Sequence, residues 1–349
     1  MKVAIITDQH FGARKNSKLF HDYFQKFYDE IFFPYLEDNS IDTVIDMGDT
    51  FDNRTGINFS ALSWAKANYF DILRDRKINL TTIVGNHTAY YKNTNTINAC
   101  ELLLREYDNI RVITEYEELK FGGLNIAFVP WVNTDNKDST YKQLKKSKCP
   151  VVMGHLELNG FLANAYHVME HGHDKGIYKD FEKVYSGHYH HRNSQENIHY
   201  LGNPYEIYWN DCGDERGFHI FDTETLEHTP VNNPFNIFEK IYFNDTNYQT
   251  FNATSYKDKI VKVIVQDKGK GTKLDKFIDK LYQAGVAELK TIESFDYGTG
   301  FVTHEYQGQE SEDTLSLLSQ YVDEVETSID KSKVKKILEN VYKEACEVT

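Results

Sequence analysis

The sequence predicts an α/β fold in which two β-sheets pack face to face and are flanked by helices. Three observations support this prediction. Up to about residue 230, strand-like apolar runs alternate with helical patterns and then give way mostly to strands. Five of the apolar runs end in a carboxylate, amide or imidazole side chain. A chain of 349 residues is long enough for two or three domains, one of them with a large core.

Three helices are expected in the first third of the chain. Residues 17–37 carry aromatic side chains at helical spacing, and a second helix fits residues 59–76. A third helix fits residues 96–106, with Leu102 and Leu103 inside it. Because these segments are amphipathic, they are expected to bury one face each.

From Leu119 onward the pattern predicts mainly strands. Gly122 and Gly123 separate two alternating runs, which is typical of a hairpin. Residues 199–209 and 216–231 add further strand-like runs. These strands are expected to form much of the second sheet.

A domain boundary is predicted near residues 230–237, where Asn and Pro cluster. We therefore expect a large domain at 1–232 and a small α+β domain at 237–300. The small domain reads strand, strand, helix, strand. Two amphipathic helices are expected within 305–349, and they could either dock on their own domain or bind a partner.

The charge distribution argues against a protein that coats nucleic acid by overall attraction. The formal net charge is −14, whereas phosphate binding normally draws on Lys and Arg. The segment 301–330 carries eight Asp or Glu and no Lys or Arg. A short basic run could be a solvated helix face or a local contact; it consists of Lys142, Lys145, Lys146 and Lys148.

Cysteine use and hydropathy indicate a cytoplasmic protein. The four cysteines lie far apart and form no C-x-x-C, so we expect reduced thiols; they are Cys100, Cys149, Cys212 and Cys346. The N-terminus runs straight into a strand, so no signal peptide is expected. No apolar run approaches the roughly 18 residues of a membrane span.

The polar residues that end the five apolar runs predict a metal site. They are Asp8 with His10, Asp49, Asn86 with His87, His155, and His188 with His190. The carboxyl ends of strands in open α/β sheets are where ligands bind, so these distant side chains could meet. Oxygen and imidazole donors without thiolates suit Mn²⁺, Fe²⁺ or Zn²⁺.

Local geometry suggests how these side chains would share ions. Asp8 and His10 are two residues apart, so in an extended chain they would point to the same side. Asp49 follows a glycine that permits a sharp turn, and its two oxygens could bridge two cations. If the amide of Asn86 faces the metal, His87 beside it would point elsewhere and have a different role.

The ordered set resembles the calcineurin-like metallophosphoesterase superfamily, whose motifs are D-x-H, G-D-x-x-D, G-N-H-[DE], G-H and G-H-x-H. Here they stand as Asp8-Gln9-His10, Gly48-Asp49-Thr50-Phe51-Asp52, Gly85-Asn86-His87-Thr88, Gly154-His155 and Gly187-His188-Tyr189-His190. Within the superfamily, KVAIITDQHFG, GDTFDNRT, GHLELNG and GHYHHR resemble the SbcD-type nucleases of the meiotic-recombination-eleven family, in the short version of T-even-like phages. The resemblance covers residues 1 to about 230 closely, and implies a four-layer αββα sandwich with a DNA-capping domain at 237–300.

The resemblance also implies roles for individual residues. One ion would be held by Asp8, His10, Asp49 and His190, and the other by Asp49, Asn86, His155 and His188. The family prefers two Mn²⁺, although Mg²⁺ or another divalent ion would fit the same donors. His87 would be the catalytic histidine. The acid that usually follows it is Thr88 here, which could leave His87 less firmly oriented.

The implied activity is a metal-dependent DNA nuclease, an exonuclease on duplex ends and an endonuclease on single strands or hairpins, acting in recombination and repair. An SbcC-type ATPase would bind the helices at 305–349, and helices 59–76 and 96–106 would form a homodimer. Asp52 and Arg192 are expected near the ligands or the substrate rather than on a metal.

Three alternatives remain open. The fold could act on a phosphate ester other than DNA, or it could serve as an inactive scaffold. The spacing of His167, His171 and His173 could mark a second metal site, although a loop near the rim of the active site explains it as well.

Overall fold

The computed structural model describes residues 1–164, 167–248, 250–266 and 271–293, and the separate positions 322, 331, 333–335 and 337. Met1–Tyr297 form one compact unit and Gly298–Thr349 a second. Apart from those separate positions, the helices predicted within 305–349 lie outside the described residues.

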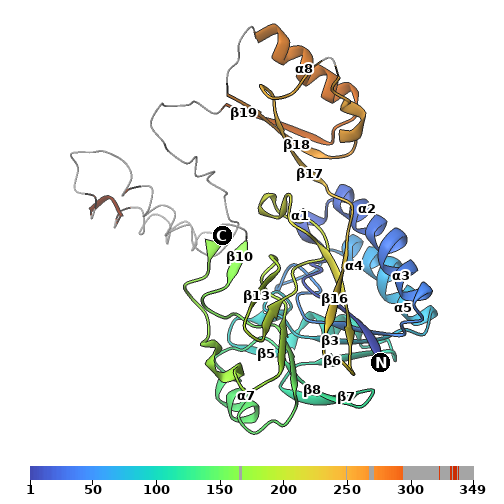
Figure 1. Ribbon diagram of the computed structural model, residues 1–349, viewed down its shortest axis with the longest axis vertical. Helices are drawn as coiled ribbons and strands as arrows, with labels where there is room; N and C mark the ends of the chain where they lie inside the picture. Colours follow the sequence, from blue (N-terminus) through green and yellow to red (C-terminus); the bar gives the residue numbers. More distant parts are fainter. Residues whose placement is uncertain are drawn as a thin grey trace. The chain divides into compact units, whose positions relative to one another are not determined.

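The described part of the chain contains two six-stranded sheets (Figure 1). The first has the order β16-β15-β1-β2-β3-β6, with β1, β2, β3 and β6 parallel and β15 and β16 antiparallel to their neighbours. Its strands are β1 (Lys2–Ile6), β2 (Thr43–Asp46), β3 (Asn79–Ile83), β6 (Ile110–Ile113), β15 (Gly217–Asp222) and β16 (His228–Asn232).

The second sheet has the order β13-β14-β12-β9-β8-β7. Its central strands β14, β12, β9 and β8 are parallel, and hairpins close both edges. Its strands are β7 (Glu117–Phe121), β8 (Leu124–Val129), β9 (Val151–Gly154), β12 (Lys183–Ser186), β13 (Asn193–Gln195) and β14 (Ile198–Tyr200). The hairpin predicted around Gly122 is therefore confirmed as β7–β8. Two small ribbons pair β4 (Ala89–Tyr91) with β5 (Thr94–Asn98) and β10 (Leu162–Asn164) with β11 (His167–Val168).

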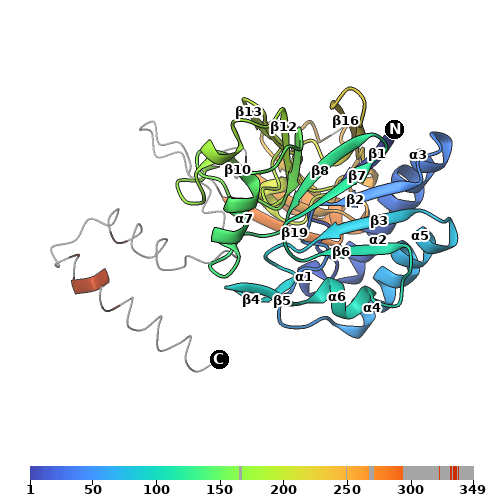
Figure 2. The same cartoon turned by 90° about the horizontal axis from the view of Figure 1, so that it is seen from below.

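The two sheets enclose an apolar layer, which confirms the predicted face-to-face packing. Ile5 and Ile45 of the first sheet contact the same cluster as Met153 and Tyr185 of the second. The outer face of the first sheet packs against aromatic helices, and the outer face of the second packs against α7 (Lys137–Leu144) and the 3-10 turn η3 (Lys175–Tyr178). Figure 2 shows α3 and α5 on the side of the first sheet and α7 on the side of the second. The order of layers is thus αββα.

The first two predicted helices are confirmed, each interrupted by a π-helical turn. They are α2 (Lys18–Phe27), η1 (Tyr28–Phe32) and α3 (Phe33–Asp38), followed later by α4 (Phe59–Ala65), η2 (Lys66–Phe70) and α5 (Asp71–Asp75). The one-turn segment α1 (Ala13–Asn16) precedes them.

The third predicted helix is shorter than expected. It spans α6 (Ala99–Leu104), whereas the first residues of the predicted range belong to β5. The Asn98 side chain accepts the N–H of Glu101 and so caps the helix at this point. The β-branched residues Thr96 and Ile97 favour the strand before it.

The strand–strand–helix–strand order predicted after residue 237 is confirmed in the described residues, within the same compact unit as the two sheets. These elements are β17 (Phe238–Tyr242), β18 (Ile260–Val265), α8 (Gly271–Gln283) and β19 (Glu288–Glu293), with the 3-10 turn η5 (Ala253–Tyr256) before β18. The three strands are parallel in the order β17-β18-β19.

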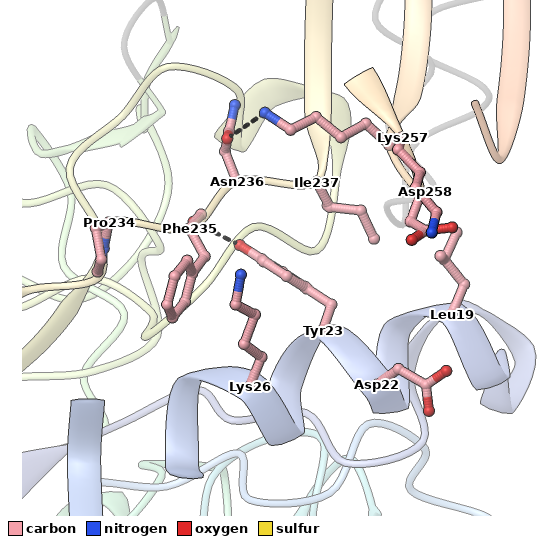
Figure 3. A pocket seen from close by; sticks show the side chains of 11 residues that line it. Leu19, Asp22, Tyr23, Lys26, Pro234, Phe235, Asn236, Ile237, Lys257 and Asp258 are labelled. Atoms are coloured by element: carbon pink, nitrogen blue, oxygen red, sulfur yellow. Dashed lines mark hydrogen bonds between the residues drawn. The ribbon is translucent and has the colours of Figure 1, made fainter. Parts of the chain in front are cut away.

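The buried carboxylate of Glu206 fixes the start of the small domain by accepting the N–H groups of Ile237 and Phe238, at 2.8 and 2.9 Å. The Tyr23 hydroxyl of α2 donates to the carbonyl of Phe235 at 3.1 Å. A cavity of about 570 Å³ lies between α2, this linker and the loop at 257–259 (Figure 3). Side chains that precede the linker in the sequence therefore hold its backbone in place.

Two further predictions concern thiols and membranes. Cys100 and Cys149 are buried free thiols and Cys212 is a half-buried one, whereas Cys346 lies outside the described residues. Among the described residues, no helix combines the length and apolar character needed to cross a membrane.

Candidate metal centre

The side chains predicted to bind metal follow the carboxyl ends of five strands. Asp8 and His10 follow β1, Asp49 follows β2, and Asn86 follows β3 in the first sheet. His155 follows β9 and His188 and His190 follow β12 in the second. Because the strands within each group are parallel, their carboxyl ends meet along one edge of the sandwich.

Two clusters of donor atoms form at this edge. In the first, Asp8, His10 and His190 place one ligand atom each within 4.8 Å of the others. The Nε2 atoms of His10 and His190 are 3.2 Å apart. Asp8 and His10 are fully buried, and His190 is half-buried. The donor set is therefore shielded from solvent on most sides.

The second cluster combines Asp49, His155 and His188. His155 Nε2 lies 3.2 Å from Asp49 Oδ2. Asn86 belongs to the same cluster, because its Oδ1 lies 2.9 Å from both His155 Nε2 and His188 Nδ1. The backbone N–H of His188 also donates to the carboxylate of Asp8, at 3.0 Å, so the two clusters are adjacent.

The backbone at these positions differs from the expected extended chain. Asp8, His10, Asp49 and His188 have φ of 53°, 47°, 51° and 84°, all in the left-handed region. The prediction that Asp8 and His10 meet because alternate residues of a strand share a side was therefore wrong in its reason. They meet through a left-handed turn, held by hydrogen bonds from Asp8 N to Gly48 O and from His10 N to Asp49 O, each 2.9 Å.

Such conformations are costly for residues with a side chain, at about 1–3 kcal/mol each. They persist only where the surrounding contacts determine them. Close approach of the neighbouring loops adds a second constraint: a Cβ on Gly85 would collide with the carboxylate of Asp49. Glycine at this position is therefore required by the packing of the two loops.

Comparisons with known proteins agree with this architecture. The chain is 30% identical over 318 residues to Exonuclease subunit 1 of Enterobacteria phage T4, covering 89% of this chain and 90% of that protein. The chain belongs to this phage family of SbcD-type nuclease subunits. It is therefore a calcineurin-like metallophosphoesterase and, by class, a phosphodiester hydrolase.

Two solved structures resemble parts of this chain at low sequence identity. A novel archaeal phosphodiesterase has 14% identity and a TM-score of 0.36, and the match covers 66% of this chain and 99% of that one. A protein of unknown function from Aquifex aeolicus has 16% identity and a TM-score of 0.30, with coverage of 51% and 84%. No profile of a known protein family matches the sequence.

His87, the expected catalytic histidine of this SbcD-type chain, lies beside the first cluster. Its ring meets that of His10 edge to face, with centroids 4.9 Å apart. Its Nδ1 donates to the carbonyl of Asp52 at 2.7 Å, and its backbone N–H donates to Asp49 Oδ1 at 2.8 Å. The ring is thus oriented by a backbone carbonyl, although the usual acid is absent.

The residue that replaces the acid has a local structural role. Thr88 Oγ1 accepts the N–H of Gly85 at 3.0 Å and lies 3.1 Å from its carbonyl. It is fully buried and closes the turn that carries Asn86 and His87. The expected loss of orientation at His87 is therefore offset by the turn and by the carbonyl of Asp52.

The two residues expected near the ligands or the substrate occupy different environments. The carboxylate of Asp52 lies 3.2 Å from His10 Nδ1, and Asp52, His10 and His87 form a third donor cluster. The guanidinium of Arg192 donates to the Leu201 carbonyl at 3.3 Å and to Asn232 Oδ1 at 2.6 Å. Arg192 thus links the residue that follows β14 to the last residue of β16.

Sequence reasoning missed a group that supports His190. Arg216, only 3% exposed, donates to the His190 carbonyl and to Asn203. Asp211 is buried, 3.3 Å from the Arg216 guanidinium and 3.9 Å from His190 Nδ1. The only signal in the sequence was an arginine at the start of an apolar strand, which is too common to identify a role.

The histidines of the centre differ in their affinity for protons. Burial alone would lower the pKa of His10, but the hydrogen bond that its ring donates to the Asp52 carboxylate and the charge of Asp49 raise it to about 9. Burial opposes the charge of His155 too, yet Asp49 raises its pKa to about 9. By contrast, burial and the neighbouring His155 lower the pKa of His188 to about 3.

The two carboxylates of the clusters differ as well, since burial raises the pKa of Asp8. Burial would raise the pKa of Asp49, but His155 and His87 hold it well below its ordinary value. The buried, anionic carboxylate of Asp49 stabilises positive charge on the imidazoles beside it. The donor set therefore fits divalent cations, as expected for the superfamily.

The alternative histidine group shows no comparable arrangement. Within the described residues, no cluster of metal-type donors includes His171 or His173. The His173 ring instead lies against Tyr141, with centroids 6.0 Å apart. The side chain of His167 lies outside the described part of the chain.

Proposed function

We propose that this protein is a DNA nuclease that hydrolyses phosphodiester bonds with a pair of divalent ions. It would act as an exonuclease on duplex ends and as an endonuclease on single strands or hairpins. The observation that carries the proposal is the pair of adjacent oxygen and imidazole clusters at one edge of the sandwich, in a chain of the SbcD-type family. The relative from phage T4 is named Exonuclease subunit 1, and this name supports DNA as the substrate.

The proposed ligands follow the two clusters. Asp8, His10 and His190 would hold one ion, and Asn86, His155 and His188 the other, with Asp49 shared. We propose Mn²⁺, and Mg²⁺ or another divalent ion would suit the same donors. When bound, such a pair lowers the pKa of a water and neutralises charge that develops on the phosphoryl oxygens.

His87 would assist the leaving oxygen. Because its Nδ1 donates to the Asp52 carbonyl, Nε2 is the nitrogen left to face a substrate. From this position an imidazolium can donate a proton to the departing alkoxide, or stabilise its charge. The carboxylate of Asp52, 3.2 Å from His10, would act on the ligand rather than on the substrate.

The decisive experiment measures cleavage of end-labelled linear duplex, hairpin and single-stranded DNA with and without Mn²⁺. His87→Ala should keep both ions and lose cleavage, whereas His171→Ala, which changes an exposed histidine, should cleave as the unaltered protein does. Activity on a phosphopeptide but not on DNA would favour the alternative phosphoesterase. Tight binding of two ions with no hydrolysis of any ester would favour the inactive scaffold.

A homodimer is proposed on the helices and ribbon beside α4 and α6. The described surface there exposes Phe59 at 87%, Leu102 at 62% and Ile97 at 44%, with Tyr90 and Tyr91 nearby in the β4–β5 ribbon. Grouped exposed apolar side chains of this size are typical of an interface. Sedimentation should show a dimer that Phe59→Glu with Leu102→Glu converts to a monomer, and a monomer in both samples would reject it.

The remaining parts of the proposal concern partners. The segment 305–349 would bind an SbcC-type ATPase, and the small domain at 237–300 would cover DNA at the metal centre. Deleting 305–349 should abolish ATPase association while metal binding persists. Unchanged association would place the partner's site elsewhere on the chain.

A further inference from the structure

A buried polar pair lies beneath the metal centre. Gln9 and Asp46 are both fully buried, and Gln9 Nε2 donates to Asp46 Oδ2 at 2.9 Å. Gln9 stands between Asp8 and His10, and Asp46 ends β2, three residues before Asp49. The pair therefore joins the two loops that carry the proposed ligands of the first ion.

The side chain of Gln9 is fixed at every polar atom. Its Oε1 accepts the hydroxyl of Tyr28 at 2.5 Å, and its backbone carbonyl accepts the hydroxyl of Tyr205 at 2.7 Å. Both tyrosines are fully buried in the aromatic layer under the first sheet. Neither end of the amide can rotate without breaking a buried hydrogen bond, which would be costly.

Asp46 is held in a similar way by neutral donors. It accepts the N–H of Gly48 at 3.1 Å and the hydroxyl of Thr50 at 2.7 Å, in addition to Gln9. In terms of stability alone, apolar side chains of the same total volume at positions 9 and 46 would be better than a buried carboxylate without a cation. A fully satisfied polar network, however, selects one geometry where apolar packing would permit several.

The loop above this pair needs such selection. Asp8 and His10 both adopt left-handed backbone, with φ of 53° and 47°, and the residue between them must keep the turn in place. Strained positions of this kind persist only when their surroundings determine them. Apolar side chains at positions 9 and 46 would fill the space without fixing the turn.

We infer that Asp46, acting through Gln9, is a positioning residue that sets the affinity of the ion held by Asp8, His10 and His190. The ion at Asn86, His155 and His188 depends on it less, because the shared Asp49 is the only one of its proposed ligands on the loop that Asp46 holds. Asn86 contacts the two histidines of its own cluster. His155 Nδ1 donates to the carbonyl of Met47, the residue after β2, whose own N–H donates to the Ile6 carbonyl at 2.9 Å. The inference rests on the ligand assignment proposed above.

The test is a Mn²⁺ titration of the full chain. The electron paramagnetic resonance signal of free Mn²⁺ measures how much of the metal remains unbound. Gln9→Leu and Asp46→Asn should each weaken the binding affinity of one of the two ions by about 10-fold or more. This is the range known for residues that hydrogen-bond to metal ligands. The second ion should change by less than about threefold, well below that range.

A reciprocal exchange distinguishes positioning from simple packing. In the double variant Gln9→Glu with Asp46→Asn, an amide again faces a carboxylate, with the donor on the other side. It should recover most of the lost affinity. Thr50→Val, which removes a single donor to Asp46, is a milder variant should the first two not fold. His219→Gln is the matched control, because it alters a buried polar side chain away from the centre and should change neither ion.

Each result bears on the inference. Selective weakening with recovery in the exchange supports it. Unchanged binding in folded Gln9→Leu, or equal weakening of both ions, overturns it while leaving the proposed nuclease intact. Fewer than two Mn²⁺ in the unaltered chain would overturn the two-ion proposal itself, and the positioning role with it.

Discussion

The molecule contains two groups of clustered histidines that lie in surroundings of different charge. One lies in the metal centre, among the carboxylates of Asp8 and Asp49. The other lies at the edge of the layer between the sheets, where His228 stands 5.3 Å from His199 and 5.0 Å from His219, measured between ring centroids. Both groups bring together imidazoles from separate strands, so proximity alone does not distinguish them.

The difference is the sign of the surrounding charge. In the second group, burial lowers the pKa of His219 to about 3, and Arg192 and His228 act in the same direction. Burial and His199 likewise lower the pKa of His228 to about 4, with Lys183 and Arg192 as further positive neighbours. In the metal centre, carboxylates overcome the same effect of burial and raise the pKa of His10 to about 9.

The two groups are distinguished by the carboxylates around them and not by pKa alone, because His188 in the metal centre also has a pKa lowered to about 3. A buried imidazole among cations is a neutral structural group, whereas one beside a buried carboxylate occupies a site made for positive charge. The second group thus provides an internal control for experiments on the first.

The largest expected effect comes from removing the shared carboxylate. Asp49→Asn should weaken Mn²⁺ binding by more than about 100-fold, because even an outer-shell partner is worth 10–100-fold. His219→Gln should leave binding unchanged. Isothermal titration calorimetry measures both. Equal losses in the two variants would show that general destabilisation, rather than ligation, explains the result.

A second prediction concerns stability against pH. The folded-state pKa of His219 is depressed to about 3 from 6.5, so the unfolded chain binds more protons and stability falls as pH drops below about 6.5. At pH 5 this residue should account for a loss of about 2 kcal/mol in the free energy of unfolding relative to pH 7. Urea unfolding in EDTA at both pH values measures it.

The contribution of His219 is isolated by difference. His219→Gln removes the titrating group, so the variant should lose about 2 kcal/mol less than the unaltered chain on the same change of pH. Groups of the metal centre titrate equally in both proteins and cancel. Parallel curves for the two proteins would show that His219 does not take up a proton on unfolding.

The contrast also defines what the sequence could predict. The proposed ligand set could be named from the sequence because each member follows an apolar run, and parallel strands bring such ends together. The small domain's order of elements was accessible for a similar reason, since its strands and helix have clear periodicity. Both can be predicted from local sequence patterns, without knowledge of contacts between residues that lie far apart in the chain.

Other features depend on pairings that no local pattern encodes. Gln9 and Asp46 are 37 positions apart, and neither residue alone suggests a buried hydrogen bond. The left-handed backbone at Asp8 and His10 was missed because tertiary hydrogen bonds impose it against the preference of the residues themselves. The start of α6 was misplaced since strand pairing of β5 overrode the helical pattern.

The third prediction concerns the protons that a metal must displace. His10 and His155 have pKa values of about 9 in the metal-free chain, so at pH 7 both carry protons that ligation removes. Below pH 9, the apparent affinity of each ion should therefore rise by up to about tenfold per pH unit. Asp52→Asn removes the hydrogen bond that most strongly raises the pKa of His10, so it should lower the number of protons released. Calorimetry in buffers of different ionisation enthalpy counts them. The second group of histidines is neutral at pH 7 and therefore releases no protons. If Asp52→Asn and the unaltered chain release the same number of protons, His10 is not the residue that the metal deprotonates.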